Sequence, residues 1–154
     1  MRRIEQWLAD YGEHHRNHTN KTLHWIGIPI IVFSLIGLLY LIPLPCALSC
    51  RGITVALVVA VLALLYYFAL SRPLAVGMLI VLGGLYAAVS ASVEVLGERA
   101  PIVMIAVFVV GWIIQFIGHK IEGQKPSFFE DLQFLLIGPL WLLADAYRKL
   151  GISY

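Results

Sequence analysis

The stretch 52–71, GITVALVVAVLALLYYFALS, contains no charged residue and decides the class of fold. About 20 apolar residues are enough for a helix to cross the hydrocarbon core of a bilayer. Three further uncharged stretches of similar or greater length cover residues 22–50, 73–93 and 100–119. The sequence therefore predicts an all-α, polytopic transmembrane helical bundle with four spans.

The composition of the whole chain agrees with lipid as the surrounding solvent. Of 154 residues, 60% are hydrophobic and 13% are charged, whereas a soluble domain carries roughly 25% charged residues. The net charge is only +2, and no basic patch is interleaved with aromatic residues, which argues against nucleic acid as a partner. The first fifteen residues lack the apolar core of a signal peptide. Because the sequence shows no internal repeat and no linker, we expect one integral-membrane domain over residues 1–154.

Both ends of the chain differ from the four spans. Near the N-terminus a set of residues recurs at helical spacing, which predicts a helix lying on the membrane surface with this stripe facing the lipid. The stripe consists of Ile4, Trp7, Leu8, Tyr11, His14, His15 and His18. Near the C-terminus the uncharged stretch 132–144 is too short for a confident span. We expect it to form a short helix that is either a fifth span or re-entrant.

Lysine and arginine predict the orientation in the membrane, because they concentrate on the cytoplasmic side. The spans are expected at about 25–40, 53–70, 73–93 and 102–117. This arrangement puts seven basic residues on one side, namely Arg2, Arg3, Arg16, Lys21, Arg72, Lys120 and Lys125, whereas the opposite loops hold Arg51 and Arg99. The N-terminus is therefore expected in the cytoplasm. The short loops favour a bacterial inner membrane, with the endoplasmic reticulum as the alternative.

Two cysteines, Cys46 and Cys50, lie in the loop after the first span. A disulfide across so tight a loop is geometrically demanding, and a zinc site would need more ligands than the loop offers. The sequence therefore favours two free thiols over a disulfide.

All five histidines fall on the side that carries most of the positive charge. His119 lies three residues before Glu122 and four after Gln115, so the three side chains share one helix face. His24 begins the first span, and His15 and His18 precede it. Imidazole and carboxylate ligands with open positions suit ferrous iron and oxygen chemistry. These residues therefore predict a metal site at this membrane face.

Simpler interpretations of the same residues remain open. His14 and His18 can serve only to hold a surface helix at the headgroup level, and His24 beside Trp25 can be an interface anchor. Glu122 can form an ion pair with Lys120 or Lys125, since a carboxylate at membrane depth is usually paired or functional.

Two blocks of sequence resemble the Mpo family of membrane dioxygenases, and the resemblance covers nearly the whole chain. The first block is His15-x-Asn17-x-x-Asn20-x-x-x-His24. The second is Trp112-Ile-Ile-Gln115-Phe-Ile-Gly118-His119, followed by Glu122, Lys125-Pro126, Asp131-Leu132 and Gly138-Pro139. The resemblance implies that His15, His24 and His119 bind the metal, with Glu122 as a further candidate. His18 is a candidate ligand by its spacing of three residues from His15. His18 stands where the family has a proline. The same match assigns Glu122, Asn20 and Gln115 to the catalytic group.

The resemblance also implies a function. Members of this family resemble Fe(2+)-dependent dioxygenases that shorten 2-hydroxy fatty acids by one carbon. The expected partners are therefore a fatty-acid-like lipid substrate, dioxygen and the lipid bilayer, and the sequence leaves the oligomeric state unknown. A di-iron hydroxylase would need more histidines than the five present. The non-enzymatic alternative is a small membrane scaffold or lipid-binding protein with interfacial histidines.

Overall fold

The computed structural model describes residues 4–13, 15–123 and 133–154, and these residues form helices and loops without a strand. Predictions that concern Arg2, Arg3, His14 or Lys125 lie outside the described residues. The helices are α1 (Ile4–Glu13), α2 (His18–Tyr40), α3 (Cys46–Ser49), α4 (Val55–Leu70), α5 (Arg72–Leu96), the 3-10 turn η1 (Gly97–Arg99), α6 (Ala100–Glu122) and α7 (Gln133–Leu150). The all-α class predicted from the sequence is confirmed.

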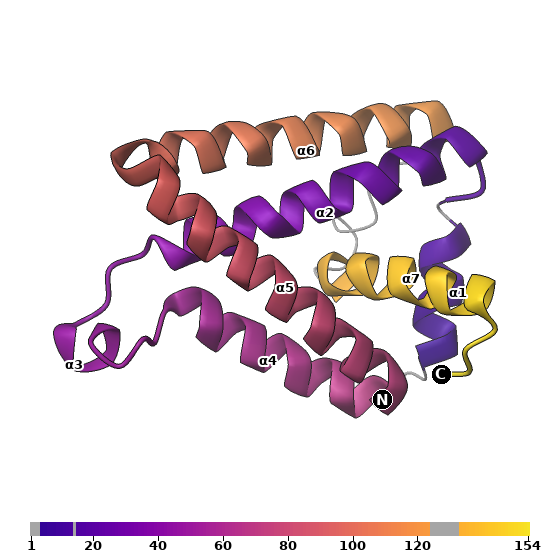
Figure 1. The fold of residues 1–154 in the computed structure, drawn as a ribbon. Coiled ribbons are helices and arrows are strands. Elements are labelled where there is room, and N and C mark those ends of the chain that lie inside the picture. Colours follow the sequence, from indigo (N-terminus) through magenta and orange to yellow (C-terminus); the bar gives the residue numbers. More distant parts are fainter. Residues whose placement is uncertain (1–3, 14, 124–132) are drawn as a thin grey trace.

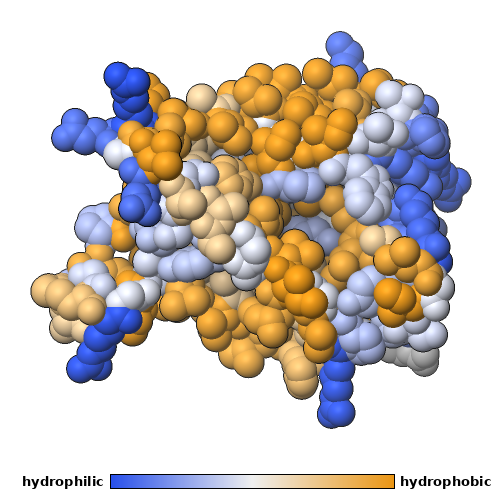
Figure 2. Space-filling view, viewed as in Figure 1, coloured by the Kyte–Doolittle hydropathy of each residue, from blue (hydrophilic) through white to orange (hydrophobic). Residues whose placement is uncertain are grey.

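The four predicted spans correspond to α2, α4, α5 and α6. By length and composition, α2 and the segment Arg72–Glu122, which contains both α5 and α6, are apolar enough to cross a membrane, whereas α4 is a shorter apolar helix. Figure 2 shows the matching surface, with a hydrophobic middle between two ends that carry most of the hydrophilic residues. The polytopic bundle is confirmed, and the exact number of four spans stays a prediction.

Helices α2 and α6 extend beyond the predicted spans at the end of the bundle that holds the histidines. The side chain of Asn17 accepts hydrogen bonds from the backbone amides of Thr19 and Asn20, so α2 begins seven residues before the predicted start at residue 25. At its other end, α6 continues to Glu122 and stops at Gly123, which has a φ of 74°. These extensions place His24 inside α2 and His119 in the last turn of α6.

Helices α2 and α6 lie side by side over most of their length (Figure 1). Glycine makes this close approach possible on both helices, as small residues do between membrane helices. A Cβ atom at Gly27 would lie 2.6 Å from Nε2 of Gln115, and one at Gly111 would lie 2.7 Å from Cγ1 of Ile31. A Cβ atom at Gly118 would collide with Oδ1 of Asn20. The two helices therefore approach closely at the end where their polar residues are found.

The N-terminal stripe is buried by protein rather than facing lipid, which corrects the sequence-based prediction. Ile4, Trp7, Leu8 and Tyr11 are all buried, and α1 packs against α7. The rings of Trp7 and Phe134 meet edge to face with centroids 5.5 Å apart. The stripe also ends early, because α1 stops at Glu13 and His18 begins the next helix with an exposed side chain.

Helix α7 does not extend to the far end of the bundle. Near its C-terminus, Nζ of Lys149 lies 4.9 Å from the ring centroid of Trp25, and the hydroxyl of Tyr147 donates to the carbonyl of Pro73. Both partners belong to the end of the bundle where α2 and α5 begin. Near its N-terminus, α7 contacts α1 through Phe134, at the same end. The structure therefore favours a helix that packs at one end of the bundle over a fifth span.

Cys46 and Cys50 form a disulfide, so the prediction of two free thiols was wrong. The short helix α3 explains the difference. One helical turn brings the two Cα atoms to 5.4 Å, which lies within the usual range for a disulfide. This loop lies at the end of the bundle opposite to α1 and α7 (Figure 1).

Candidate metal centre

Three histidines from three separate parts of the chain meet at one point. Nε2 of His15 lies 2.9 Å from Nε2 of His24, which lies 3.3 Å from Nε2 of His119. One ring nitrogen from each of the three lies within 4.8 Å of the others. The exposed fractions of these side chains are 0%, 1% and 6%, respectively. They come from the α1–α2 linker, α2 and α6, so the cluster exists only in the folded chain.

The backbone fixes the direction in which two of these rings point. Nδ1 of His15 donates to the carbonyl of Tyr11 at 2.6 Å, and Nδ1 of His24 donates to the carbonyl of Asn20 at 3.0 Å. A carbonyl can only accept, so the proton of each neutral ring lies on Nδ1. The facing Nε2 atoms then carry lone pairs, as metal-binding histidines do when the other nitrogen donates to a carbonyl.

The spacing of the nitrogens suits a bound metal ion. Metal–nitrogen bonds of about 2.1 Å at tetrahedral or octahedral angles separate two ligand nitrogens by about 3.0–3.4 Å. The distances of 2.9 and 3.3 Å match this separation closely. Two lone pairs that face each other at such a distance repel, and a cation between them removes the repulsion. The donor set therefore fits a divalent transition metal such as iron or zinc.

Glu122 holds the linker that contains His15, and it lies outside the three-histidine group. Oε1 accepts from the backbone amide of Arg16 at 2.9 Å, and Oε2 accepts from the amide of Asn17 at 2.9 Å. Oε2 also accepts from Nδ2 of Asn20 at 2.9 Å. A carboxylate that accepts from three donors is well satisfied in this position. Glu122 thus ties the end of α6 to the linker and to α2.

Gln115 lies one helical turn before His119 on α6, beside the cluster. Its side chain is 5% exposed, and Nε2 has no hydrogen-bond partner among the described residues. A buried donor without a partner costs free energy, so such a group in a native structure calls for an explanation. Gln115 lines the same cavity as His24 and His119. Its amide is therefore free to donate to a molecule that binds there.

Aromatic rings cover the cluster from the side of α1 and α7. Tyr11 stacks on His15 with ring centroids 4.3 Å apart, and Trp141 lies 5.5 Å from the same ring. Burial raises the pKa of the Tyr11 hydroxyl, so it stays protonated over the physiological range. Tyr11 and Trp141 were not among the site residues predicted from the sequence. The available signal was the four-residue separation of Tyr11 and His15, which was interpreted as a membrane-facing stripe.

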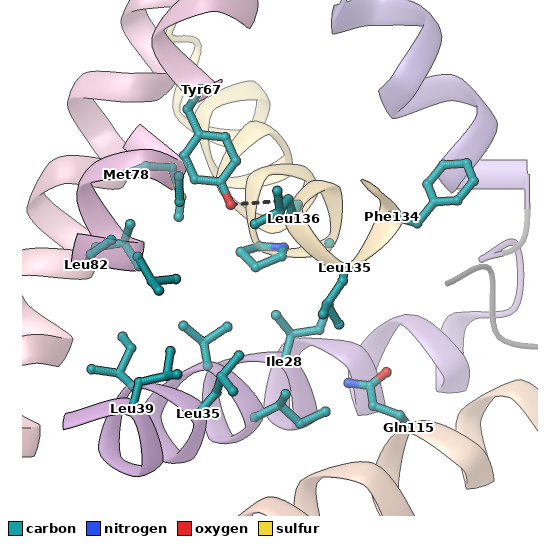
Figure 3. A pocket seen from close by; sticks show the side chains of 18 of the residues that line it. Ile28, Leu35, Leu39, Tyr67, Met78, Leu82, Gln115, Phe134, Leu135 and Leu136 are labelled. Carbon is teal, nitrogen blue, oxygen red and sulfur yellow. Dashed lines mark hydrogen bonds between the residues drawn. The ribbon is translucent and has the colours of Figure 1, made fainter. Parts of the chain in front are cut away.

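A cavity extends from the cluster into the bundle. It is bounded by His24, Gln115 and His119 at the polar end, and elsewhere almost entirely by apolar side chains of α2, α4, α5 and α7. Figure 3 shows Gln115 at one end and Leu39 and Leu82 at the other, with Ile28 and Leu35 between them. A polar end with a long apolar interior suits an amphiphilic molecule.

Comparison with known proteins agrees with this geometry. A family model described as "2-hydroxy-palmitic acid dioxygenase Mpo1-like" matches residues 1–150. The chain belongs to the Mpo1-like family. It is also 29% identical over 152 residues to 2-hydroxy-palmitic acid dioxygenase MPO1 of Saccharomyces cerevisiae (strain ATCC 204508 / S288c), covering 96% of this chain and 82% of the yeast protein. No solved structure matches the chain.

Among the site residues predicted from the sequence, the structure thus brings together His15, His24 and His119, with Gln115 beside them. Asn20 and Glu122 bond to each other at the edge of the cluster. His18 is exposed at the first residue of α2 and does not belong to the group. His14 lies outside the described residues.

Proposed function

We propose that this chain is an iron-dependent dioxygenase that removes one carbon from 2-hydroxy fatty acids. The observation that carries the proposal is the convergence of His15, His24 and His119 with their Nε2 atoms facing one another. Three ligands of this kind leave open positions on a divalent ion. Ferrous iron held there would supply the activation of dioxygen and the polarisation of the substrate's 2-hydroxy acid group.

The surrounding side chains position the substrate. The amide of Gln115, whose Nε2 has no partner in the part of the chain that the structure describes, donates to a carboxylate or hydroxyl oxygen at the polar end of the cavity. The protonated hydroxyl of Tyr11, which also lines the cavity, is a second polar group there. The acyl tail lies among the apolar side chains of α2 and α4, away from water. Membership of the Mpo1-like family and the name of the yeast relative support this substrate class.

The roles of Glu122 and Asn20 follow from their bonds. Glu122 accepts from the amides of Arg16 and Asn17 and from Asn20, so it positions the linker that carries His15. Asn20 in turn supplies the carbonyl that orients His24. Both are positioning residues in this proposal, and His18 is not a ligand.

The proposal includes an orientation for a single integral-membrane domain. Arg16, Lys21, Arg72 and Lys120 are predicted on the side that holds the histidines, and this excess of positive charge favours the cytoplasm. The Cys46–Cys50 disulfide lies at the opposite end, and disulfides persist in oxidising compartments. We therefore place the histidine cluster at the cytoplasmic face. Because the loops are short, we place the protein in a bacterial inner membrane.

Purified protein in detergent tests the proposal. Anaerobic loading with ferrous iron, followed by 2-hydroxypalmitate and air, is expected to give about one iron per chain and the fifteen-carbon acid, measured by mass spectrometry. Palmitate without the 2-hydroxyl is the matched control and should remain intact. Folded protein that binds no iron and leaves 2-hydroxypalmitate unchanged would contradict the proposal and favour a lipid-binding scaffold.

A further inference from the structure

The apolar part of the cavity has a definite length along α2. Its lining residues on this helix begin at His24 and end at Leu39, fifteen residues later. At a rise of 1.5 Å per residue, this interval spans about 22 Å. Between these two positions the lining residues of α2 are all aliphatic, namely Ile28, Ile31, Val32, Leu35 and Ile36.

The far end of the cavity is formed by three helices. Leu39 of α2, Ala56 at the start of α4 and Leu82 of α5 all line the cavity. Ala56 is 1% exposed, so its small side chain faces protein and the cavity rather than lipid. Figure 3 places Leu39 and Leu82 together at this end, away from Gln115.

Beyond Leu39, where the cavity lining on α2 ends, hydrogen-bonded side chains join α2, α5 and the start of α4. The hydroxyl of Tyr40 lies 3.2 Å from Oγ of Ser90, and Oγ1 of Thr54 lies 3.0 Å from the hydroxyl of Tyr86. The rings of Tyr40 and Tyr86 are 5.6 Å apart. The contact of Tyr40 with Ser90 connects the end of α2 to α5, and the contact of Thr54 with Tyr86 connects the N-cap of α4 to α5. The end wall is therefore fixed by polar contacts as well as by packing.

The distance from the cluster to this wall matches the length of an extended acyl chain. With C–C bonds of about 1.5 Å, a zigzag chain advances about 1.25 Å per carbon, so about 22 Å holds roughly 16–18 carbons. We propose that Leu39, Ala56 and Leu82 form the end of an acyl channel that sets the preferred chain length of the substrate. This inference rests on the proposed function, since it assigns the polar end to the acid group.

Substitutions at the end wall test the channel in both directions. Ala56→Leu fills about two or three methylene positions and should move the optimum toward shorter acids. Because a buried methylene is worth about fourfold in affinity, the ratio of C18 to C12 binding should fall about tenfold or more. Leu39→Ala should move the optimum toward longer acids. Val58→Leu is the matched control for α4, because Val58 is 47% exposed on the outer surface and its change should leave the profile intact.

Two readouts separate this inference from the function itself. Binding of plain saturated fatty acids from C10 to C20 is followed by the change in intrinsic tryptophan fluorescence, because Trp112 lines the cavity. Turnover is followed with the matching 2-hydroxy acids. Opposite shifts of the binding profile in Ala56→Leu and Leu39→Ala support the channel even where no acid is turned over. Folded variants that keep the wild-type profile in both assays would overturn it, even if the enzyme is active. Should Ala56→Leu fail to fold, Leu39→Ala and Leu82→Ala carry the test, and an unshifted profile in both would refute the assignment.

Discussion

His15 and His24 face each other through Nε2 atoms 2.9 Å apart, while each ring donates from Nδ1 to a backbone carbonyl. This arrangement leaves two lone pairs in contact unless a cation lies between them. The first prediction follows directly. His24→Ala and His119→Ala should each lower bound iron from about one per chain to near zero, measured by elemental analysis after dialysis.

His18→Ala is the matched control for these variants, because His18 is exposed and lies outside the cluster. It should keep the iron content of the wild type. Equal loss of iron in His18→Ala and His24→Ala would mean that the ligand set proposed here is incorrect.

Removing the charge of Glu122 should weaken metal binding without removing a ligand. Glu122→Gln replaces one acceptor oxygen by a donor, which opposes the backbone amides of Arg16 and Asn17. Loss of such supporting contacts typically lowers metal affinity about 10–100-fold. Metal titration of the apo-protein measures this change. Glu98→Gln, exposed in η1 near the other end of the bundle, should bind metal like the wild type; an unchanged affinity in both variants would exclude the positioning role.

Gln115→Leu should affect the substrate rather than the metal. The variant removes a buried amide donor that has no partner among the described residues. A hydrogen bond to a charged group is worth about 1.5–3 kcal/mol, so KM for a 2-hydroxy acid should rise about 10–100-fold while iron content stays the same. An unchanged KM would show that the amide does not contact the substrate.

Close packing of α2 and α6 predicts opposite outcomes for two glycines. A Cβ atom at Gly118 would collide with Oδ1 of Asn20, whereas one at Gly83 would meet nothing within 4 Å. Gly118→Ala should lower the free energy of unfolding by about 1–3 kcal/mol, as overpacking does, and should weaken iron binding. Gly83→Ala should leave Tm unchanged or raise it, since alanine favours a helix. Thermal unfolding in detergent compares the two, and equal Tm values would argue against this contact.

Membrane-impermeant thiol labelling of intact cells tests the orientation. After mild reduction, Cys46 and Cys50 should react from outside, because their loop is placed opposite the cytoplasm. A Lys120→Cys variant in a Cys46→Ser, Cys50→Ser background should react only after the membrane is opened. Labelling of the two loops in the reverse pattern would invert the proposed topology.

The helices that could be predicted from the sequence are those with the same apolar surroundings along their whole length. A helix surrounded by lipid must be apolar along its whole length, so the four uncharged stretches located α2, α4, α5 and α6. The spacing of His119, Gln115 and Glu122 likewise put them on one helix, and resemblance to the family selected His15, His24 and His119 before the structure showed that they meet.

Contacts that depend on tertiary structure were not predictable in the same way. An apolar stripe on α1 has the same pattern whether lipid or α7 covers it, so Trp7 and Tyr11 gave no sign of their partners. For Glu122 the sequence predicted a metal ion or a lysine as partner. Among the described residues it accepts instead from the Asn20 side chain and from backbone amides that are free only in the linker between α1 and α2. The pairing of Cys46 and Cys50 depended on a single turn of helix within a loop.

The non-helical linker at residues 15–17 has a consequence for how the site opens. His24 and His119 belong to the tightly packed α2–α6 pair, but His15 is carried by a linker that Glu122 and the packing of α1 on α7 hold in place. Lifting this N-terminal segment would withdraw one ligand and uncover the other two in a single movement. Release of the ion would then require local unfolding of α1 and the linker at residues 15–17, so bound metal would protect α1 and this linker from proteolysis.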